Sequence, residues 1–168
     1  WFPDPDLPPD EEWEAPVHEI HEAIDDAFSS WDVFRLYGDP AYFMTEMDQW
    51  AGKYGEKKVV KWWTNRKKAM AYAIRTWHQD WTAERLTHAG DTDDLKDPLV
   101  EHVGNAVKWP TRIRDDDTGQ FLWVIGKDGQ KSPRKMDLTM AAILSWKARG
   151  DAIELGALNR KKYRTAAW

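Results

Sequence analysis

The chain has 168 residues, of which 42% are hydrophobic, and this length and composition favour one globular unit with a sizeable core. It contains no cysteine, which excludes disulfides and thiolate metal sites, and no apolar run approaches the roughly 18 residues that span a bilayer. The net charge of -5 is unevenly divided, because residues 1–32 contain eleven Asp and Glu and no Lys or Arg, whereas the rest of the chain contains all 24 basic residues.

Acidic and proline-rich residues open the chain. Residues 1–16 contain five of the nine prolines, and proline fixes φ and offers no amide to a ladder, so this segment is predicted to be an extended connector. The chain begins with Trp1 rather than Met, from which we expect it to lie inside a longer polypeptide. An amphipathic helix is predicted within residues 17–31, where apolar residues recur at spacings of three and four: Val17, Ile20, Ile24 and Phe28.

Strand and helix patterns alternate in the next segment. Residues 32–40, "DVFRLYGDP", predict a short, mostly buried strand that ends in a Gly-Asp-Pro turn. Residues 41–55 predict a helix closed by Gly55, and residues 57–64, "KKVVKWWT", predict a second strand. The order helix, strand, helix, strand indicates an α/β layer in which the two strands are parallel.

The second half of the chain is predicted to be mainly helical, with one hairpin. Residues 65–86 predict the longest helix, with one apolar side made by Met70, Ile74, Trp77 and Trp81. A polar loop over 87–98 and a short helix over 99–109 follow. Two β-prone arms around Asp-Asp-Asp-Thr-Gly within residues 111–130 predict a late β-hairpin, and a C-terminal helix comes after it.

Two signals compete for the start of that last helix. Ser132 followed by Pro133 is typical of an N-cap and first-turn proline, which would place Asp137 one turn inside the helix. Alternatively, Asp137 is itself the N-cap and accepts backbone amides of the first turn.

Metal and nucleotide motifs are mostly excluded by spacing. His18 and His21 lack the spacing of a zinc-binding helix, residues 91–97 lack the glycine of a calcium loop, and no P-loop is present. Oxygen donors at the ends of elements remain, and Asp39 and Asp137 are the candidates for holding Mg²⁺ or Mn²⁺. The alternative for Asp39 is the role of a turn residue before proline.

An ordered series of segments resembles the C-terminal nuclease domain of tailed-phage terminase large subunits. The segments run through nearly the whole chain: "WEAPVHEIHEAIDDAF", "DVFRLYGDPAYF", "WAGKYG", "VVKWWTNRKKAMAYAIRTWHQD", "LTHAGD", "EHVGNA" and "SPRKMDLTMAAILSWKARGDAI". The resemblance implies an RNase H-like α/β fold and a two-metal-ion endonuclease that cuts concatemeric double-stranded DNA during packaging. It also implies localisation in the host cytoplasm, with a portal and a terminase small subunit as partners.

The resemblance assigns roles to individual residues. Asp39 matches the strand-end aspartate of the family and Asp137 the aspartate that opens the last helix, so both are implied to be catalytic metal ligands for two Mg²⁺ or Mn²⁺ ions. Arg134 and Lys135 are implied to lie near the scissile phosphate.

Further basic and polar residues are candidates for DNA binding or support of the site. Arg66 and Lys67 belong to a basic cluster within residues 57–68 and are expected to bind DNA, although solvated surface is the alternative for such clusters. His88, His102 and Asn105 fall in segments that resemble the family and are candidates for supporting the site. Simple anchoring of a loop is the alternative for the last two.

The family pattern is incomplete in this chain. The first catalytic aspartate of the family would precede Trp1, and the ATPase domain is expected upstream in a parent chain. We therefore assign residues 17–155 to the latter part of an RNase H-like domain whose first strands are missing, and residues 156–168 to a basic tail. The fragment alone is expected to be inactive. The alternatives are a noncatalytic DNA-binding or assembly module of the packaging machinery, and a degenerate prophage remnant.

Overall fold

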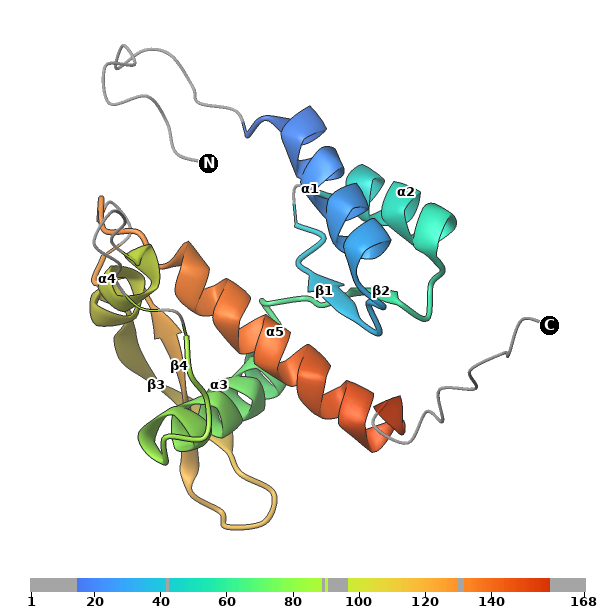
Figure 1. Cartoon of the computed structure of the whole chain (residues 1–168). Coiled ribbons are helices and arrows are strands. Elements are labelled where there is room, and N and C mark those ends of the chain that lie inside the picture. Colours follow the sequence, from blue (N-terminus) through green and yellow to red (C-terminus); the bar gives the residue numbers. More distant parts are fainter. Residues whose placement is uncertain (1–14, 42, 89, 91–96, 130–131, 158–168) are drawn as a thin grey trace, which may run out of the picture. The chain divides into compact units, whose positions relative to one another are not determined.

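The computed structural model describes residues 15–41, 43–88, 90, 97–129 and 132–157 (Figure 1). The chain divides into two compact units, one up to Phe34 and one from Arg35. The described residues form five helices and two two-stranded sheets, so the expected mixed α/β class is confirmed. None of these helices combines the length and the apolar character that crossing a membrane requires.

The first unit contains the helix α1 (Val17–Ser30), which confirms the helix predicted within residues 17–31. The amide of Ile20 donates to the carbonyl oxygen of Pro16 at 3.1 Å and starts the helix. The amide of Trp31 donates to the carbonyl of Ala27, and Trp31 itself is extended, which ends it.

The second unit begins with a strand–helix–strand element. The strands β1 (Leu36–Gly38) and β2 (Val59–Lys61) are joined by the helix α2 (Met44–Tyr54), and they pair in parallel with Leu36 opposite Val59. The predicted parallel pair is therefore confirmed, although each strand has only three residues. Gly55, at φ 99°, ends α2 as expected, because this backbone region costs glycine little.

Gly38 of β1 lies close to α2. A Cβ atom on Gly38 would lie 2.6 Å from Sδ of Met47, a fully buried residue of α2. The missing side chain therefore allows α2 to pack closely on the strand.

The core of the second unit forms between two long helices, α3 (Lys67–Thr82) and α5 (Asp137–Glu154). The predicted apolar side of α3 is confirmed, because Met70, Ile74 and Trp77 are buried and Trp81 packs at the edge of the same cluster. Ile143 of α5, with no exposed surface, is the deepest residue from the opposite side.

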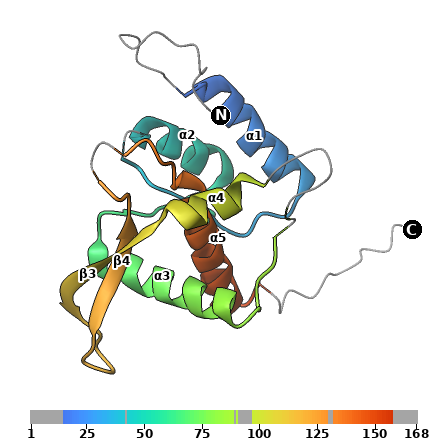
Figure 2. The same cartoon turned by 90° about the vertical axis from the view of Figure 1, so that its left-hand side faces the viewer.

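A β-hairpin covers part of α3, as Figure 2 shows. Its strands are β3 (Val107–Arg114) and β4 (Phe121–Gly126), which pair antiparallel with an irregularity between Pro110 and Arg114. The predicted late hairpin is confirmed, but its first arm begins earlier than expected.

The helix predicted over 99–109 is wrong at its end, because α4 (Pro98–Asn105) stops four residues sooner. Ala106 is extended, and Val107, Lys108 and Trp109 pair with β4 instead of continuing the helix. β-branched and aromatic residues pack well on a pleated ribbon, and here a partner strand is available to them.

The start of α5 corrects both predictions made for it. Residues 132–136 are not helical, so Ser132 does not begin the helix, and its hydroxyl oxygen instead accepts the amide of Arg134 at 3.3 Å. The N-cap is Met136, whose carbonyl accepts the amides of Thr139 and Met140. Asp137 is the first helical residue and its side chain caps nothing.

Candidate metal and DNA site

Asp39 follows β1 directly, and both of its carboxylate oxygens accept hydrogen bonds. The amide of Ala41 donates to Oδ1 at 3.1 Å, which makes the turn expected before a proline. The hydroxyl of Thr64, just after β2, donates to Oδ2. Asp39 is therefore a turn residue and also connects the ends of the two parallel strands, with lone pairs left over on both oxygens.

Asp137 has a different environment, although it too stands at the end of an element. Its side chain is exposed, and within the described part of the chain it makes no hydrogen bond or ion pair. A carboxylate in the first turn of a helix interacts favourably with the helix dipole. The structure thus leaves this carboxylate available to a ligand.

His102 and Asn105 of α4 hold the backbone on both sides of Asp137. His102 is buried, and its Nδ1 accepts the amide of Leu138 at 3.1 Å. One turn further along α4, Nδ2 of Asn105 donates to the carbonyl of Lys135 at 2.9 Å. His102 and Asn105 therefore anchor the segment 135–138, and this segment carries Asp137.

A cavity of about 240 Å³ lies beside the start of α3, and neither Asp39 nor Asp137 lines it. Thr64, the hydrogen-bond partner of Asp39, lines it from the end of β2, and Met140, one turn after Asp137, lines it from α5. Asn65 and Lys67 add polar groups to its wall. Asp39 and Asp137 are not in contact with each other among the interactions of the described residues.

Basic side chains concentrate at the start of α3. Arg66 is the N-cap residue, Lys67 and Lys68 follow, and the first turn contains no acid. Helix N-termini carry a partial positive charge, so three bases there reinforce a positive potential that suits a phosphate. Lys68 is engaged with Asp116 at 2.7 Å, whereas Lys67 lines the cavity.

The other two predicted DNA-binding residues precede α5. Arg134 is exposed and only approaches Asp128, at 4.0 Å, and Lys135 is exposed as well. Both lie within three residues of Asp137 in the sequence, and their place near a phosphate stays a prediction.

His88 belongs to a structural contact instead. Its Nδ1 lies 2.6 Å from Oδ2 of Asp97, and its ring stacks on Trp81 at 5.5 Å. Asp97 is the N-cap of α4, and the amide of Leu99, followed by His88, lowers the pKa of this carboxyl. His88 therefore fixes the start of α4, and through α4 it acts on the site only indirectly.

The turn of the hairpin contains a contact that the sequence alone did not indicate. Asp115 is 3% exposed, and it accepts the amide and hydroxyl of Thr118 and a guanidinium hydrogen bond from Arg75 of α3. Thr118, and then Arg75, hold the pKa of Asp115 well below its usual range. Asp116 binds Lys68 of the same helix, so two aspartates of the turn dock the hairpin on α3.

The donor set matches hard divalent cations in type. Mg²⁺ takes one or two protein carboxylates and completes its shell with water and phosphate oxygens, and Asp39 and Asp137 supply carboxylates of that kind. Within the residues that the structure describes, no three His, Asp or Glu side chains gather into one metal-binding group. Comparisons with protein-family models, with curated proteins and with solved structures found no match to this chain.

Proposed function

We propose that this chain is part of a metal-dependent endonuclease domain of the phage terminase type, with an incomplete RNase H-like fold, that cuts double-stranded DNA during genome packaging. The observation that carries the proposal is the exposed carboxylate of Asp137, which is unpartnered among the described residues and whose backbone is held on both sides by α4. Asp39, at the end of β1, supplies a second carboxylate. The parallel β1–α2–β2 element, with α5 packed against β1, supports an α/β nuclease architecture.

Asp39 and Asp137 would hold the divalent ions, together with an aspartate that the resemblance places on an upstream strand. Bound Mg²⁺ or Mn²⁺ lowers the pKa of a water nucleophile and stabilises the leaving 3′ oxygen. The chain contributes preorganisation, because the Ala41 amide and the Thr64 hydroxyl fix the orientation of Asp39 before any ligand arrives. The backbone of Asp137 is fixed in the same way by His102 and Asn105.

The basic residues would position the DNA. Arg66 and Lys67 lie at the positive end of α3, and Arg134 and Lys135 precede Asp137. All four are suited to phosphate oxygens, and phosphate contacts orient a duplex without reading its sequence. We therefore propose cutting with weak sequence preference.

The test uses a polypeptide that contains this chain together with any sequence that precedes it. Asp39→Ala and Asp137→Ala are each assayed for cleavage of plasmid DNA in Mn²⁺, and loss of cleavage is expected in both. Asp117→Ala is the matched control, because Asp117 is an exposed acid of the hairpin turn away from the cavity. Full activity in either of the first two variants removes that residue from the mechanism.

A noncatalytic DNA-binding or assembly module is the second candidate. It is favoured by the basic start of α3 together with the lack of a three-membered acidic group among the described residues. DNA binding that weakens steeply with salt, without cleavage even when the upstream sequence is present, would select it. A degenerate prophage remnant would instead show no cooperative unfolding by circular dichroism.

A further inference from the structure

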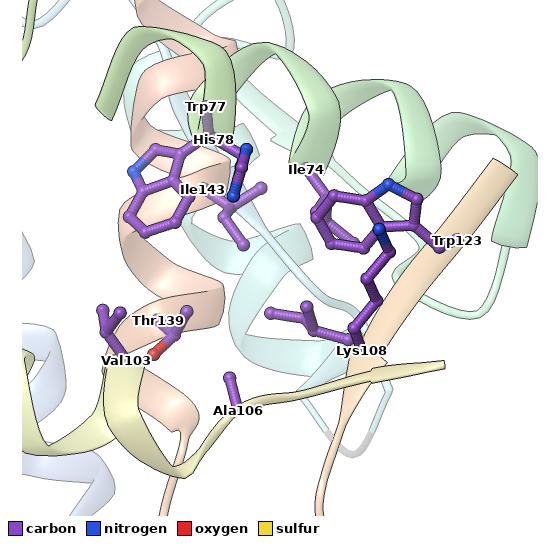
Figure 3. Close-up of a pocket in the computed structure, with 10 residues that line it drawn as sticks. Ile74, Trp77, His78, Val103, Ala106, Lys108, Trp123, Thr139 and Ile143 are labelled. Atoms are coloured by element: carbon purple, nitrogen blue, oxygen red, sulfur yellow. The ribbon is translucent and has the colours of Figure 1, made fainter. Parts of the chain in front are cut away.

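A separate cavity, of about 210 Å³, lies between α3, α4, α5 and the β3–β4 hairpin (Figure 3). Its inner wall contains buried residues of the core helices, among them Ile74 and Ile143, and its outer wall contains the exposed residues His78 and Lys108. The cavity therefore runs from the surface to the core. Protein interiors keep few voids larger than a water molecule, so a hollow of this size has room for a ligand.

The volume limits the size of that ligand. A cavity of about 150 Å³ with apolar walls is large enough for benzene. Pockets for drug-sized molecules begin at about 300 Å³. The cavity lies between these sizes, and it therefore fits one six-membered ring with small substituents.

The chemistry of the walls limits the ligand further. Ile74, Val103, Ile125 and Ile143 offer apolar contact to a ring, and no Asp or Glu of the described residues lines the cavity. The one ammonium group on the wall is that of Lys108, which lies 4.5 Å from the ring centroid of Trp123 and pairs with no acid among the described residues. The electrostatics of the cavity therefore favour an anionic group over a cationic one.

A second polar group lies across the cavity from Lys108. Thr139 is 1% exposed, and its hydroxyl has no hydrogen-bond partner among the described residues. Figure 3 shows Thr139 beside Val103, on the side opposite Lys108 and Trp123. A buried hydroxyl without a partner is unfavourable, and a polar substituent on a bound ring can supply that partner.

We propose that this cavity binds a single-ring aromatic carboxylate, with the ring against Ile74, Ile125 and Ile143 and the carboxylate at Lys108. The proposal is independent of the nuclease assignment, because none of the predicted metal or DNA residues lines this cavity. A ring hydroxyl opposite the carboxylate is placed to pair with Thr139.

The test compares three probes of similar size by isothermal titration at low salt: 4-hydroxybenzoate, neutral 4-hydroxybenzamide and cationic 4-hydroxybenzylamine. We expect the carboxylate to bind at least tenfold more tightly than the amide, and the amine to bind least. Lys108→Met should reduce the affinity for the carboxylate to that for the amide. Lys57→Met, which changes an exposed lysine outside the cavity, should leave all three affinities unchanged.

A substitution that fills the cavity provides the second part of the test. Ala106 lines the cavity just after α4, in extended conformation, so Ala106→Leu adds volume there without changing a charge. It should abolish binding of all probes while the protein still unfolds cooperatively. The proposal fails if no probe binds at millimolar concentration, if the amine or amide binds as tightly as the carboxylate, or if Lys108→Met or Ala106→Leu leaves binding of the carboxylate intact.

Discussion

The backbone amide of Leu138 donates a hydrogen bond of 3.1 Å to Nδ1 of His102, so a buried histidine of α4 holds the residue that follows Asp137. The imidazole acts here as a hydrogen-bond acceptor for a helix N-terminus, where free amides need partners. The position of Asp137 therefore depends on α4, a helix more than thirty residues earlier in the chain.

Removing this acceptor should destabilise the protein. We expect His102→Ala to lower the free energy of unfolding by about 2 kcal/mol, because it removes a buried side chain and leaves the part-buried amide of Leu138 unpaired. His102→Asn should recover part of the loss, since the amide oxygen of asparagine lies near the position of Nδ1. Urea unfolding at pH 7 measures both, and equal losses in the two variants would contradict the role of acceptor.

The two predicted metal ligands should respond differently to substitution. Asp137→Asn should change stability by no more than about 0.5 kcal/mol, because the side chain is exposed and has no partner among the described residues. Asp39→Ala should cost more, about 1 kcal/mol, because Ala41 and Thr64 each lose an acceptor. Thermal unfolding of the two variants gives this comparison, and a larger loss in Asp137→Asn would show that its carboxylate has a structural partner.

The hairpin turn should contribute a pH-dependent part of the stability. Because the pKa of Asp115 is depressed in the folded state, its contribution is present above the ordinary carboxyl pKa of about 4 and is lost as the pH falls further. The difference in urea midpoint between the parent and Asp115→Asn should therefore be largest at pH 6 and narrow toward pH 3. Asp117→Asn is the control in the same turn, and it should show neither effect.

The contact between β1 and α5 can be tested at the other end of the pH scale. Tyr37 donates to Oδ2 of Asp151 at 2.6 Å, and burial, followed by this hydrogen bond, raises the pKa of the phenol. Tyr37→Phe should cost about 1 kcal/mol at pH 8. A group with a raised pKa loses its contribution as the pH rises above the unfolded value of about 10, so the difference should shrink at pH 11. A constant difference across this range would argue against the phenol as its source.

Two isoleucines of α5 offer a matched pair for the core. Ile143 has no exposed surface, whereas Ile153 is 36% exposed on the same helix. Ile143→Ala should cost about 3 kcal/mol through lost contacts and a new cavity, and Ile153→Ala less than about 1 kcal/mol. Chemical denaturation measures the free energy of unfolding of both variants. Similar losses would show that Ile143 is not a core residue.

Periodicity and turn chemistry predicted the order of elements from the sequence. The apolar spacing of Met70, Ile74 and Trp77 determined the buried side of α3, and Gly55 determined the end of α2, because both depend on local geometry alone. The end of α4 was not predictable in this way. Val107, Lys108 and Trp109 leave the helix because β4, encoded fifteen or more residues later, pairs with them.

The candidate site was predictable only in part for the same reason. The position of Asp39 at the end of β1 follows from the local Gly-Asp-Pro pattern, whereas neither local signal predicted the start of α5 correctly. The hydrogen bonds around the two aspartates could not be predicted from local patterns. Thr64, which follows the other strand, donates to Asp39, and His102 of α4 accepts the amide of Leu138. Asp115 was missed as a docking residue because its partner, Arg75, belongs to another element.

The hydrogen bond between Tyr37 and Asp151 attaches the C-terminal end of α5 to β1. Asp151 fixes one end of the helix to the strand that leads into Asp39, and Asp137 stands fourteen residues earlier, about 21 Å along a regular helix. Asp137 therefore lies at the end of α5 that is remote from this contact with β1. A Cβ atom added at Gly150, beside the fixed end, would meet nothing within 4 Å, so an alanine fits there and would stiffen this part of the helix.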